Sequence, residues 1–482
     1  MGLKMKTVIA ALVVLPTSLN AAVGEDATPK VFAHYYTWWA GDRPEYPLMP
    51  KSGWYSHHLD AKGRPKPPNL FLRHIAQARS AGLAGFSCEW PGKESPETKL
   101  ILDGFVTANN RLPPKRRMQY LLCFDSTIWA MEYKKLIKEW YEPIPFTEQI
   151  AKGFAAEMGF VCNEVPKQDR NFKTSYLHID GRPAVFVYNA HGFSGAWEQA
   201  ISLARKTCEA SGGIYLIGDF EVSPHAMFDE KRKEEYPCKA SHFDAVTNYT
   251  LFSGHTFMSL WEYISSGQLD SALQNGKCLA EASQSKQFYP GIIPQYFKSK
   301  KAHANNTATK RRSRQLADRA FVTDGSAGFV PIYKPTGSED REAVVRNSRC
   351  TLQILLRKTL QAEPQVVFIT SWNEPYEGTM IEPTRSPNPA GYVMNDDFLD
   401  LIASCLRESS PGWGDFDVDG HVDDQDETIL QSCLNAETSD QQSPCCMLAD
   451  KNGNGKVDEE DLKAFQSCRD SNDQEQGRKK KR

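Results

Sequence analysis

The feature that most constrains the fold is a repeated alternation of short apolar segments with helical segments between residues 30 and 407. Such alternation is typical of parallel β-strands joined by crossover helices. Eight segments fit a strand: 31–37, 84–90, 119–125, 184–189, 214–220, 243–249, 291–297 and 366–371. Helical periodicity lies between them, at 70–79, 197–208 and 352–360 among others. The pattern predicts an α/β fold, a (β/α)8 TIM-type barrel over residues 29–407. A doubly wound open sheet is the alternative, but no glycine-rich phosphate turn follows the first strand.

Polar and aromatic residues recur where the predicted strands end. In a (β/α)8 barrel the active site lies at the C-terminal ends of the strands, so these residues are candidates for contact with a substrate. The predicted substrate-binding residues are Tyr35, Tyr36, Trp38, Glu89, Trp90, Asp125, His191, Tyr249, Tyr296, Asn373 and Glu382. Aromatic faces pack on pyranose rings, so the set favours a carbohydrate cleft. Asp125, like the nearby Asp219, has the alternative role of capping the helix that follows its strand.

Two carboxylates follow the last predicted strand at a spacing of three residues. Glu374 and Glu377 lie among aromatic residues and a glycine. Cleavage of a glycosidic bond requires one group that protonates the leaving oxygen and another that assists at the anomeric carbon. We therefore predict that Glu374 and Glu377 are the catalytic pair; ordinary surface acids in a loop are the alternative. Pro375 disfavours helical geometry at Glu374, so this residue is expected to be extended.

The same segment resembles a known family of glycosidases. The runs Ser371-Trp372-Asn373-Glu374, Glu377-Gly378-Thr379 and Ile381-Glu382 are similar to the signature of glycoside hydrolase family 99, the endo-α-mannosidases, whose wider relatives include family 71. Segments 32–39, 243–249 and 290–296 resemble its first, sixth and seventh strands. The resemblance implies an endo-acting, retaining hydrolase that needs no cofactor for catalysis. Glu374 would assist the sugar 2-hydroxyl and Glu377 would act as the acid/base. Pro375-Tyr376 replaces the family's Trp-His between the acids, which leaves the identity of the sugar open.

A second glycosidase ancestry is excluded by the order of the elements. Asn373-Glu374-Pro375 is also the acid/base motif of the large clan that contains cellulases and β-mannanases. In that clan the motif closes the fourth strand, and a nucleophilic Glu follows on the seventh. Here the motif closes the last predicted strand, and no later strand follows.

The N-terminus and the composition bear on location and partners. Lys4 and Lys6 precede an apolar run at 8–16 and then small residues, which predicts a cleaved signal peptide over 1–22. The run is too short for a membrane span, so we expect a secreted, periplasmic or cell-surface protein with no membrane segment after cleavage. A net charge of −3 argues against a nucleic-acid partner. The 12 cysteines permit disulfides, and the absence of Cys-x-x-Cys spacing argues against a zinc site.

The chain ends in a duplicated acidic segment. Residues 415–426 repeat as 450–461 at an offset of 35 residues, each with glycine at the sixth position. Oxygen donors at alternating positions around such a glycine are typical of EF-hand-type calcium loops. The predicted ligands of two Ca²⁺ sites are Asp415, Asp417, Asp419, His421, Asp423, Asp426, Asp450, Asn452, Asn454, Lys456, Asp458 and Asp461. The twelfth position is Asp, not the Glu usual in EF-hands.

Two such loops at the end of a secreted glycosidase resemble a dockerin, which implies a cohesin-type partner. We therefore predict a small all-α EF-hand/dockerin-like domain over 412–470 and a disordered basic tail over 471–482. Cys433, Cys445, Cys446 and Cys468 predict disulfides that stabilise a domain with little core.

These observations converge on a secreted glycoside hydrolase that acts on a polysaccharide or glycan. Segment 298–314 is rich in Lys and Arg and contains no acid, which indicates either a solvated loop or recognition of a sulfated or uronic glycan. The resemblance instead favours an α-mannan-like substrate. One alternative function is a catalytically inactive glycan-binding barrel anchored through the dockerin-like domain. Another is a polysaccharide-processing transferase.

Overall fold

The computed structural model describes residues 29–37, 69–139, 142–227, 229–251, 263–264, 266–294, 341–374, 379–383, 397–407, 414–416, 421–434, 444–452 and 456–479. The predicted signal peptide, the Lys- and Arg-rich segment 298–314, and the site residues Trp38, Tyr296 and Glu377 lie outside the described residues.

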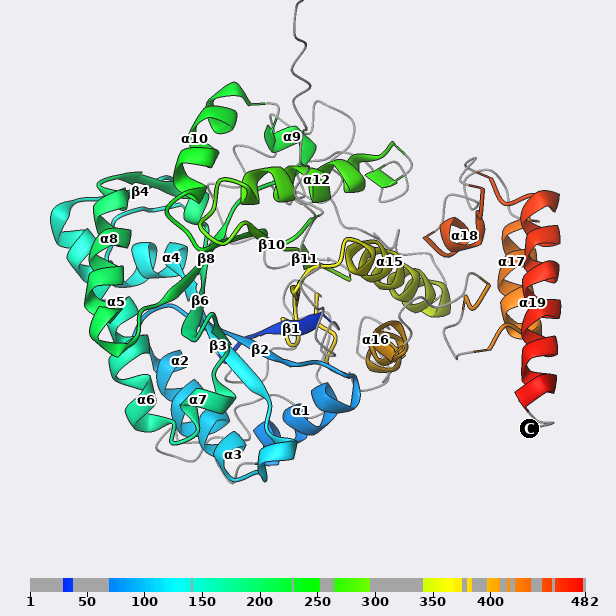
Figure 1. The fold of residues 1–482 in the computed structure, drawn as a ribbon, viewed down its shortest axis with the longest axis horizontal. Coiled ribbons are helices and arrows are strands. Elements are labelled where there is room, and N and C mark those ends of the chain that lie inside the picture. The colour runs from blue at the N-terminus through cyan, green and yellow to red at the C-terminus, as the bar shows by residue number, and fades with distance from the viewer. Residues whose placement is uncertain are drawn as a thin grey trace, which may run out of the picture.

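Parallel strands form a closed ring at the centre of the molecule (Figure 1). They are β1 (Lys30–Tyr35), β2 (Gly85–Trp90), β3 (Gln119–Asp125), β6 (Arg182–Tyr188), β8 (Tyr215–Asp219), β9 (Ala245–Thr247), β10 (Gln287–Tyr289), β11 (Gly291–Ile292) and β12 (Val366–Ile369). Parallel pairs join β1 to β2, β2 to β3, β3 to β6, β6 to β8 and β8 to β9. On its other side, β1 pairs in parallel with β12. β10 pairs with β9 and β11 pairs with β12, so these two short strands together close the ring. The predicted (β/α)8 barrel is confirmed.

The seventh strand is divided at Pro290, between β10 and β11. Proline has no N–H group to donate to a neighbouring strand, which explains a break at this position. Gly291 then passes so close to the sixth strand that a Cβ atom would lie 2.1 Å from the Asn248 carbonyl oxygen. The apolar pattern predicts this strand at 291–297 and misses β10, because the polar segment 284–287 hides the start of the apolar run.

Helices surround the ring of strands (Figure 1). They are α1 (Asn69–Ser80), α2 (Pro96–Lys99), α3 (Thr107–Asn110), α4 (Ser126–Ile128), α5 (Glu148–Asn163), α6 (Val165–Gln168), α7 (Phe172–Ser175), α8 (Trp197–Cys208), α9 (Pro224–Met227), α10 (Glu230–Ala240), α12 (Gln268–Ala280), α15 (Arg341–Gln361) and α16 (Asp397–Arg407). Two π-helical turns, Leu100–Val106 and Trp129–Tyr133, and the minor strands β4 (Ile144–Phe146), β5 (His178–Ile179) and β7 (Phe193–Gly195) lie in the connections. The predicted helices 70–79 and 197–208 match α1 and α8, and α15 includes the predicted 352–360.

Alternation along the strands divides the core into two layers. Phe186 of β6 lies 5.0 Å from Phe368 of β12 and 4.9 Å from His34 of β1, measured between ring centroids. Because β6 is not a neighbour of β1 or β12, the three rings fill the interior of the barrel. The next residue along each strand points outward, toward the helices. The ring centroid of Tyr35, for example, lies 6.5 Å from that of Phe71 of α1. Period-two alternation therefore decides which strand-end residues reach the mouth of the barrel.

A small helical module lies beside α15 (Figure 1). It contains α17 (Asp424–Leu434), α18 (Pro444–Ala449) and α19 (Glu459–Lys479) around a core that includes Phe416, Leu430 and Phe465. A disulfide between Cys433 and Cys446 joins α17 to α18, and one between Cys350 and Cys445 joins α18 to α15 of the barrel. The module is thus covalently attached to the barrel at a second point besides the chain itself.

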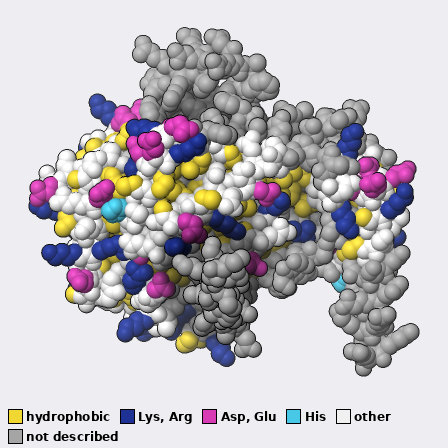
Figure 2. All heavy atoms as spheres, turned by 45° about the horizontal axis from the view of Figure 1, so that its top comes forward, with side chains coloured by type: hydrophobic (Ala, Val, Ile, Leu, Met, Phe, Trp, Pro, Cys, Tyr) yellow, Lys and Arg dark blue, Asp and Glu magenta, His cyan; other side chains and the backbone are white. Residues whose placement is uncertain are grey.

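On the face shown in Figure 2, acidic and basic side chains of the described residues are interspersed, with apolar atoms between them. Within the described part of the chain, no helix combines the length and the apolar character that a membrane span requires.

Candidate active site

Carboxyl groups gather at the C-terminal mouth of the barrel. Glu89 is the last residue of β2 that points into the barrel. Asp125 and Asp219 are the last residues of β3 and β8, and Glu374 follows β12. All four side chains are buried, with exposed fractions between 3% and 6%. Because parallel strands in a barrel end on the same rim, residues distant in sequence are brought together here.

Glu89 and Asp125 form a hydrogen-bonded pair of carboxyl groups. Burial raises the pKa of Glu89 well above its usual range, and the charges of Asp125 and Glu374 raise it further. Burial also raises the pKa of Asp125 to about 6, although hydrogen bonds from the Ile128 N–H, Glu89 and the Thr127 N–H oppose the shift. Glu89 therefore carries the proton and donates it to the Asp125 carboxylate at neutral pH. Two neighbouring carboxyl groups with different pKa values are suited to acid/base chemistry, because one holds a proton while the other is ionised.

Asp125 also has the structural role that the sequence left open. Its Oδ1 accepts the N–H groups of Thr127 and Ile128 at 2.9 and 2.8 Å, which caps α4. Asp219 instead links the ends of two other strands, since its carboxylate accepts the Asn189 N–H at 2.9 Å and the Tyr249 N–H at 2.8 Å. Burial raises the pKa of Asp219 to about 7 despite these bonds.

The segment after β12 is fixed by hydrogen bonds at both ends. Asn373 Oδ1 accepts the Tyr36 N–H at 2.8 Å and its Nδ2 donates to the Tyr36 carbonyl at 2.7 Å, which joins the segment to the end of β1. The Glu374 N–H donates to Ser371 Oγ at 2.9 Å, and its carbonyl accepts the Thr379 N–H at 3.3 Å. Glu374 is neither helical nor part of a strand. The peptide bond between Thr370 and Ser371 is cis.

Tyrosines lie beside the carboxyl groups. The hydroxyl groups of Tyr36 and Tyr249 are hydrogen-bonded to each other, and the Tyr249 ring lies 5.1 Å from that of Tyr188. Burial raises the pKa of Tyr36 well above its usual range, and Tyr249, Glu89 and Glu374 add to the shift. Aromatic rings next to carboxyl groups at a barrel mouth can bind a sugar ring while the acids reach its glycosidic oxygen.

His191 lies next to this group, above β8. Its Nδ1 lies 3.3 Å from the Asp219 carbonyl oxygen, to which it donates, and burial lowers its pKa to about 4. The imidazole is therefore neutral at pH 7, with Nε2 as the acceptor. The structure thus brings together at one end of the barrel the residues Tyr36, Glu89, Asp125, His191, Tyr249, Asn373 and Glu374.

Three predicted contact residues face away from the mouth. Tyr35 and Trp90 occupy outward positions of β1 and β2, and Trp90 packs on Phe160 of α5 at 5.9 Å. Glu382 is buried behind the barrel, where its Oε1 lies 2.9 Å from His74 Nε2. The prediction that these three residues line the cleft is wrong. The period-two alternation of the strands turns Tyr35 and Trp90 toward the helices. Glu382 lies next to α1, where it contacts His74.

The sequence alone did not indicate His74. It joins Tyr35 and Glu382, since its Nδ1 lies 2.8 Å from the Tyr35 hydroxyl while Nε2 faces Glu382. The linked side chains hold the end of the Glu374 segment against α1 and β1. A histidine in an amphipathic helix is common, so only the fold reveals this role.

The two acidic repeats adopt matching local geometry. Asp426 accepts the Phe416 and Asp423 N–H groups, and Asp461 accepts the Lys451 N–H at 2.9 Å and the Asp458 N–H at 2.9 Å. The predicted ligands Asp417, Asp419 and Asn454 lie outside the described residues. The described predicted ligands, Asp415, His421, Asp423, Asp426, Asp450, Asn452, Lys456, Asp458 and Asp461, lie in the two loops that lead into α17 and α19 or at the first turns of these helices.

Comparisons with known proteins give partial matches. Residues 168–392 match the family described as "Glycosyltransferase WbsX". Among solved structures, the chain is similar to the GH99 endo-alpha-mannosidase from Bacteroides thetaiotaomicron, with 16% identity, a TM-score of 0.48, and coverage of 79% of this chain and 96% of that chain. A "glycoside hydrolase-like protein" matches with 17% identity and a TM-score of 0.47 over 79% of this chain and 94% of that chain. A family 39 glycoside hydrolase from Bacteroides cellulosilyticus matches with 12% identity and a TM-score of 0.37 over 79% of this chain and 64% of that chain. No curated protein shows a significant match.

Proposed function

We propose that the protein is a glycoside hydrolase. The observation that carries the proposal is the group of buried Glu89, Asp125 and Glu374 beside Tyr36 and Tyr249 at the C-terminal mouth of the barrel. Carboxyl groups held in different protonation states next to aromatic rings are what the hydrolysis of a glycosidic bond requires.

In this proposal Glu374 acts at the anomeric centre by assisting the 2-hydroxyl of the sugar. Glu374 takes the proton of the 2-hydroxyl as its oxygen attacks the anomeric carbon and forms a 1,2-anhydro sugar, while Glu377 protonates the leaving oxygen. Glu377 then deprotonates the water that opens this ring, and Glu374 returns the proton to the 2-oxygen. The two successive inversions give retention of configuration. The bonds of Asn373 to Tyr36 support the role of Glu374, because they fix the backbone that carries it to the rim of the barrel. The Glu89 proton is engaged with Asp125, so the pair offers acceptor oxygens to the hydroxyl groups of the bound sugar.

The test is the release of new reducing ends from a panel of α-mannan, neutral, uronic and sulfated polysaccharides by the full-length protein. We expect turnover of at least one class, lost in Glu374→Gln. Glu209→Gln, an exposed acid at the opposite end of the barrel, should retain turnover. Proton NMR of the first product reports the anomer, and size analysis of early products separates endo from exo action. Binding to a glycan without any reducing-end release would instead identify a noncatalytic glycan-binding barrel.

A transferase is the second candidate, because the family match to residues 168–392 carries a glycosyltransferase description. Both reactions need a carboxyl group beside an anomeric carbon and differ in the acceptor. Incubation in ¹⁸O-labelled water followed by mass spectrometry separates them. A hydrolase incorporates the label at the new reducing end, whereas a transferase gives unlabelled, lengthened products.

We further infer that the protein is exported and that its C-terminal module binds two calcium ions. The matching bonds of Asp426 and Asp461 support two equivalent loops, and carboxylates spaced as in these loops repel one another without a cation. A cohesin-type partner is the binding function that the dockerin resemblance suggests. Isothermal titration with Ca²⁺ tests the stoichiometry, and binding to immobilised cohesins with and without Ca²⁺ tests the partner.

A further inference from the structure

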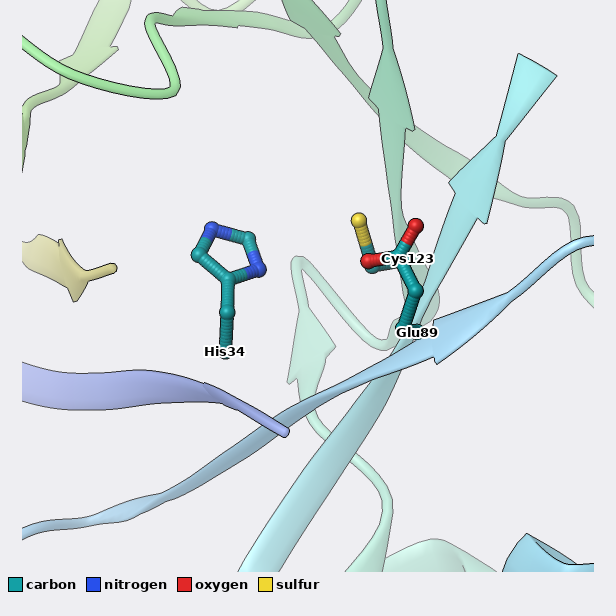
Figure 3. A group of neighbouring side chains, drawn as sticks. All are labelled: His34, Glu89 and Cys123. Carbon is teal, nitrogen blue, oxygen red and sulfur yellow. The ribbon is translucent and has the colours of Figure 1, made fainter. Parts of the chain in front are cut away.

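Three potential metal ligands meet inside the barrel, below the mouth. His34 of β1, Glu89 of β2 and Cys123 of β3 each contribute one ligand atom, and these atoms all lie within 4.8 Å of one another. Figure 3 shows that the side chains approach from adjacent strands and that one ring nitrogen of His34 faces the other two. All three residues are buried, with exposed fractions of 0%, 3% and 0%.

His34 indicates that this group lacks a component. Within the described part of the chain, neither ring nitrogen of His34 has a hydrogen-bond partner, although the side chain is fully buried. Its ring is enclosed by Phe186, Tyr249 and Phe368, at centroid distances of 4.9, 5.0 and 5.6 Å. Buried polar atoms without a partner are rare, and each requires an explanation such as a bound water or ion.

The donor set narrows the choice of ion. It combines one imidazole nitrogen, one thiol sulfur and one carboxyl oxygen, the three ligand types that Zn²⁺ accepts at bond lengths of about 2.0–2.3 Å. A span of 4.8 Å or less between the donors is compatible with a shared ion after small side-chain rotations. Ca²⁺ and Mg²⁺ prefer oxygen ligands alone and are disfavoured by Cys123.

We propose that His34, Glu89 and Cys123 bind a divalent transition-metal ion of the zinc class in the barrel interior. The absence of Cys-x-x-Cys spacing argues against a zinc site when the sequence alone is considered. Here the ligands come from three neighbouring strands, so no short motif marks them. Binding displaces two protons to solvent, one from Cys123 and one from Glu89, because the thiolate and the carboxylate are the ligands. The ion satisfies a ring nitrogen of His34 and balances the two new negative charges at the base of the mouth. The inference does not depend on the proposed hydrolysis.

Metal content and cobalt spectroscopy test the site without an activity assay. The full-length protein is produced in zinc-replete or cobalt-supplemented medium, passed through metal-free gel filtration, and analysed by inductively coupled plasma mass spectrometry and absorption. We expect about one zinc per chain, and in the cobalt form a thiolate-to-Co²⁺ charge-transfer band in the near ultraviolet. The calcium loops consist of oxygen donors and give no such band.

Cys88→Ser is the matched control, because Cys88 is a buried thiol on β2 one residue before Glu89. It shares the outward side of the strand with Phe86, whose ring packs on that of Phe105 outside the barrel. Cys123→Ser should lower zinc content by more than about tenfold and abolish the band, while Cys88→Ser retains both. His34→Gln provides a second loss-of-ligand variant if Cys123→Ser does not fold. A folded wild-type protein that takes up no zinc and shows no thiolate band overturns the proposal. Equal metal content and an equal band in Cys123→Ser also overturn it, since the metal would then lie elsewhere.

Discussion

Glu89 of the barrel and the buried acids of the C-terminal module are held in opposite ways. In the module, Asp426 and Asp461 are buried, and each accepts two backbone N–H groups. In the barrel, the partners of Glu89 among the described residues are the side chains of Asp125 and Cys123, and burial raises its pKa. A buried acid that backbone donors satisfy stabilises a loop, whereas one that shares a proton with another acid remains available for chemistry.

The two regions also differ in what holds them together. The barrel has a continuous core that extends from β1 to α16. Among the described residues of the module, the buried apolar core consists of eight residues, which include two disulfide-bonded cysteines. So small a core provides little stabilisation without cross-links or bound ions. We therefore expect turnover to depend on the barrel and the folding of the module to depend on bound ions, a division that the following experiments test.

The largest expected effect is on catalysis. Glu374→Gln and Glu377→Gln should each lower kcat by roughly 10²–10⁴, the range for loss of a general acid or base. The amide keeps the size of each side chain but cannot exchange the proton. Initial rates on the glycan found to be a substrate provide the measurement. Asp426→Asn in the module should leave kcat within about twofold. Near wild-type turnover of Glu377→Gln on an unactivated glycan would exclude its role as acid/base.

The second prediction concerns removal of calcium. EGTA should unfold residues 415–468 and leave most hydrolytic activity intact, because the carboxylates of the two loops repel one another without a cation. The disulfides of the module limit this loss by restricting the unfolded chain. Limited proteolysis and differential scanning calorimetry follow the module while reducing-end assays follow the barrel. Restoration by Ca²⁺ and not by Mg²⁺ is the control. Loss of turnover without a change in the module would place the calcium in the barrel.

The third prediction concerns the disulfide between the two regions. The pair Cys350→Ser and Cys445→Ser should destabilise the module by about 2–4 kcal/mol, since the bond closes a long loop of the unfolded chain. The carbonyl of Asp415 still accepts bonds from Gln353 and Arg357, at 3.5 and 3.3 Å, so contact with α15 is weakened and not abolished. The variant should keep the kcat of the wild type and show an earlier, separate calorimetric transition.

Removal of the disulfide between Cys162 and Cys208 is the matched control for this experiment, because it joins α5 to α8 within the barrel. That variant should lower the barrel transition and leave the module unchanged. If the two variants lower the same single transition, the barrel and the module unfold as one unit and the division is wrong.

The sequence predicts the barrel well because each strand is a local apolar run and the connections of a parallel sheet follow general rules. It also indicates the mouth, because strand ends are visible as the polar residues that follow these runs. Orientation is harder to predict: the ends of strands are uncertain by a residue or two, and a shift of one residue turns Tyr35 or Trp90 to the other face. His74, and the grouping of His34 with Cys123, depend on contacts between distant segments and leave no pattern in the chain.

The last and smallest expected effect is the dependence of barrel stability on pH. Burial raises the pKa of Asp219 from 3.8 to about 7 in the folded protein. The folded state therefore binds this proton more tightly than the unfolded chain, and the resulting stabilisation is complete below about pH 4 and is lost as the pH rises through 7. Asp125, with its pKa of about 6, acts in the same direction. The free energy of unfolding of the barrel should fall by about 1–2 kcal/mol between pH 6 and pH 7.

Urea titrations across this pH range test the contribution of Asp219, because Asp219→Asn cannot ionise and should show a flatter dependence than the wild type. The amide of this variant offers one acceptor oxygen to the Asn189 and Tyr249 N–H groups, where the carboxylate offers two. Its stability should therefore be lower throughout, and the slope is the informative quantity. Asp180→Asn, an exposed control, should keep the wild-type slope. An equal slope in Asp219→Asn would show that this buried acid does not set the pH dependence of the barrel.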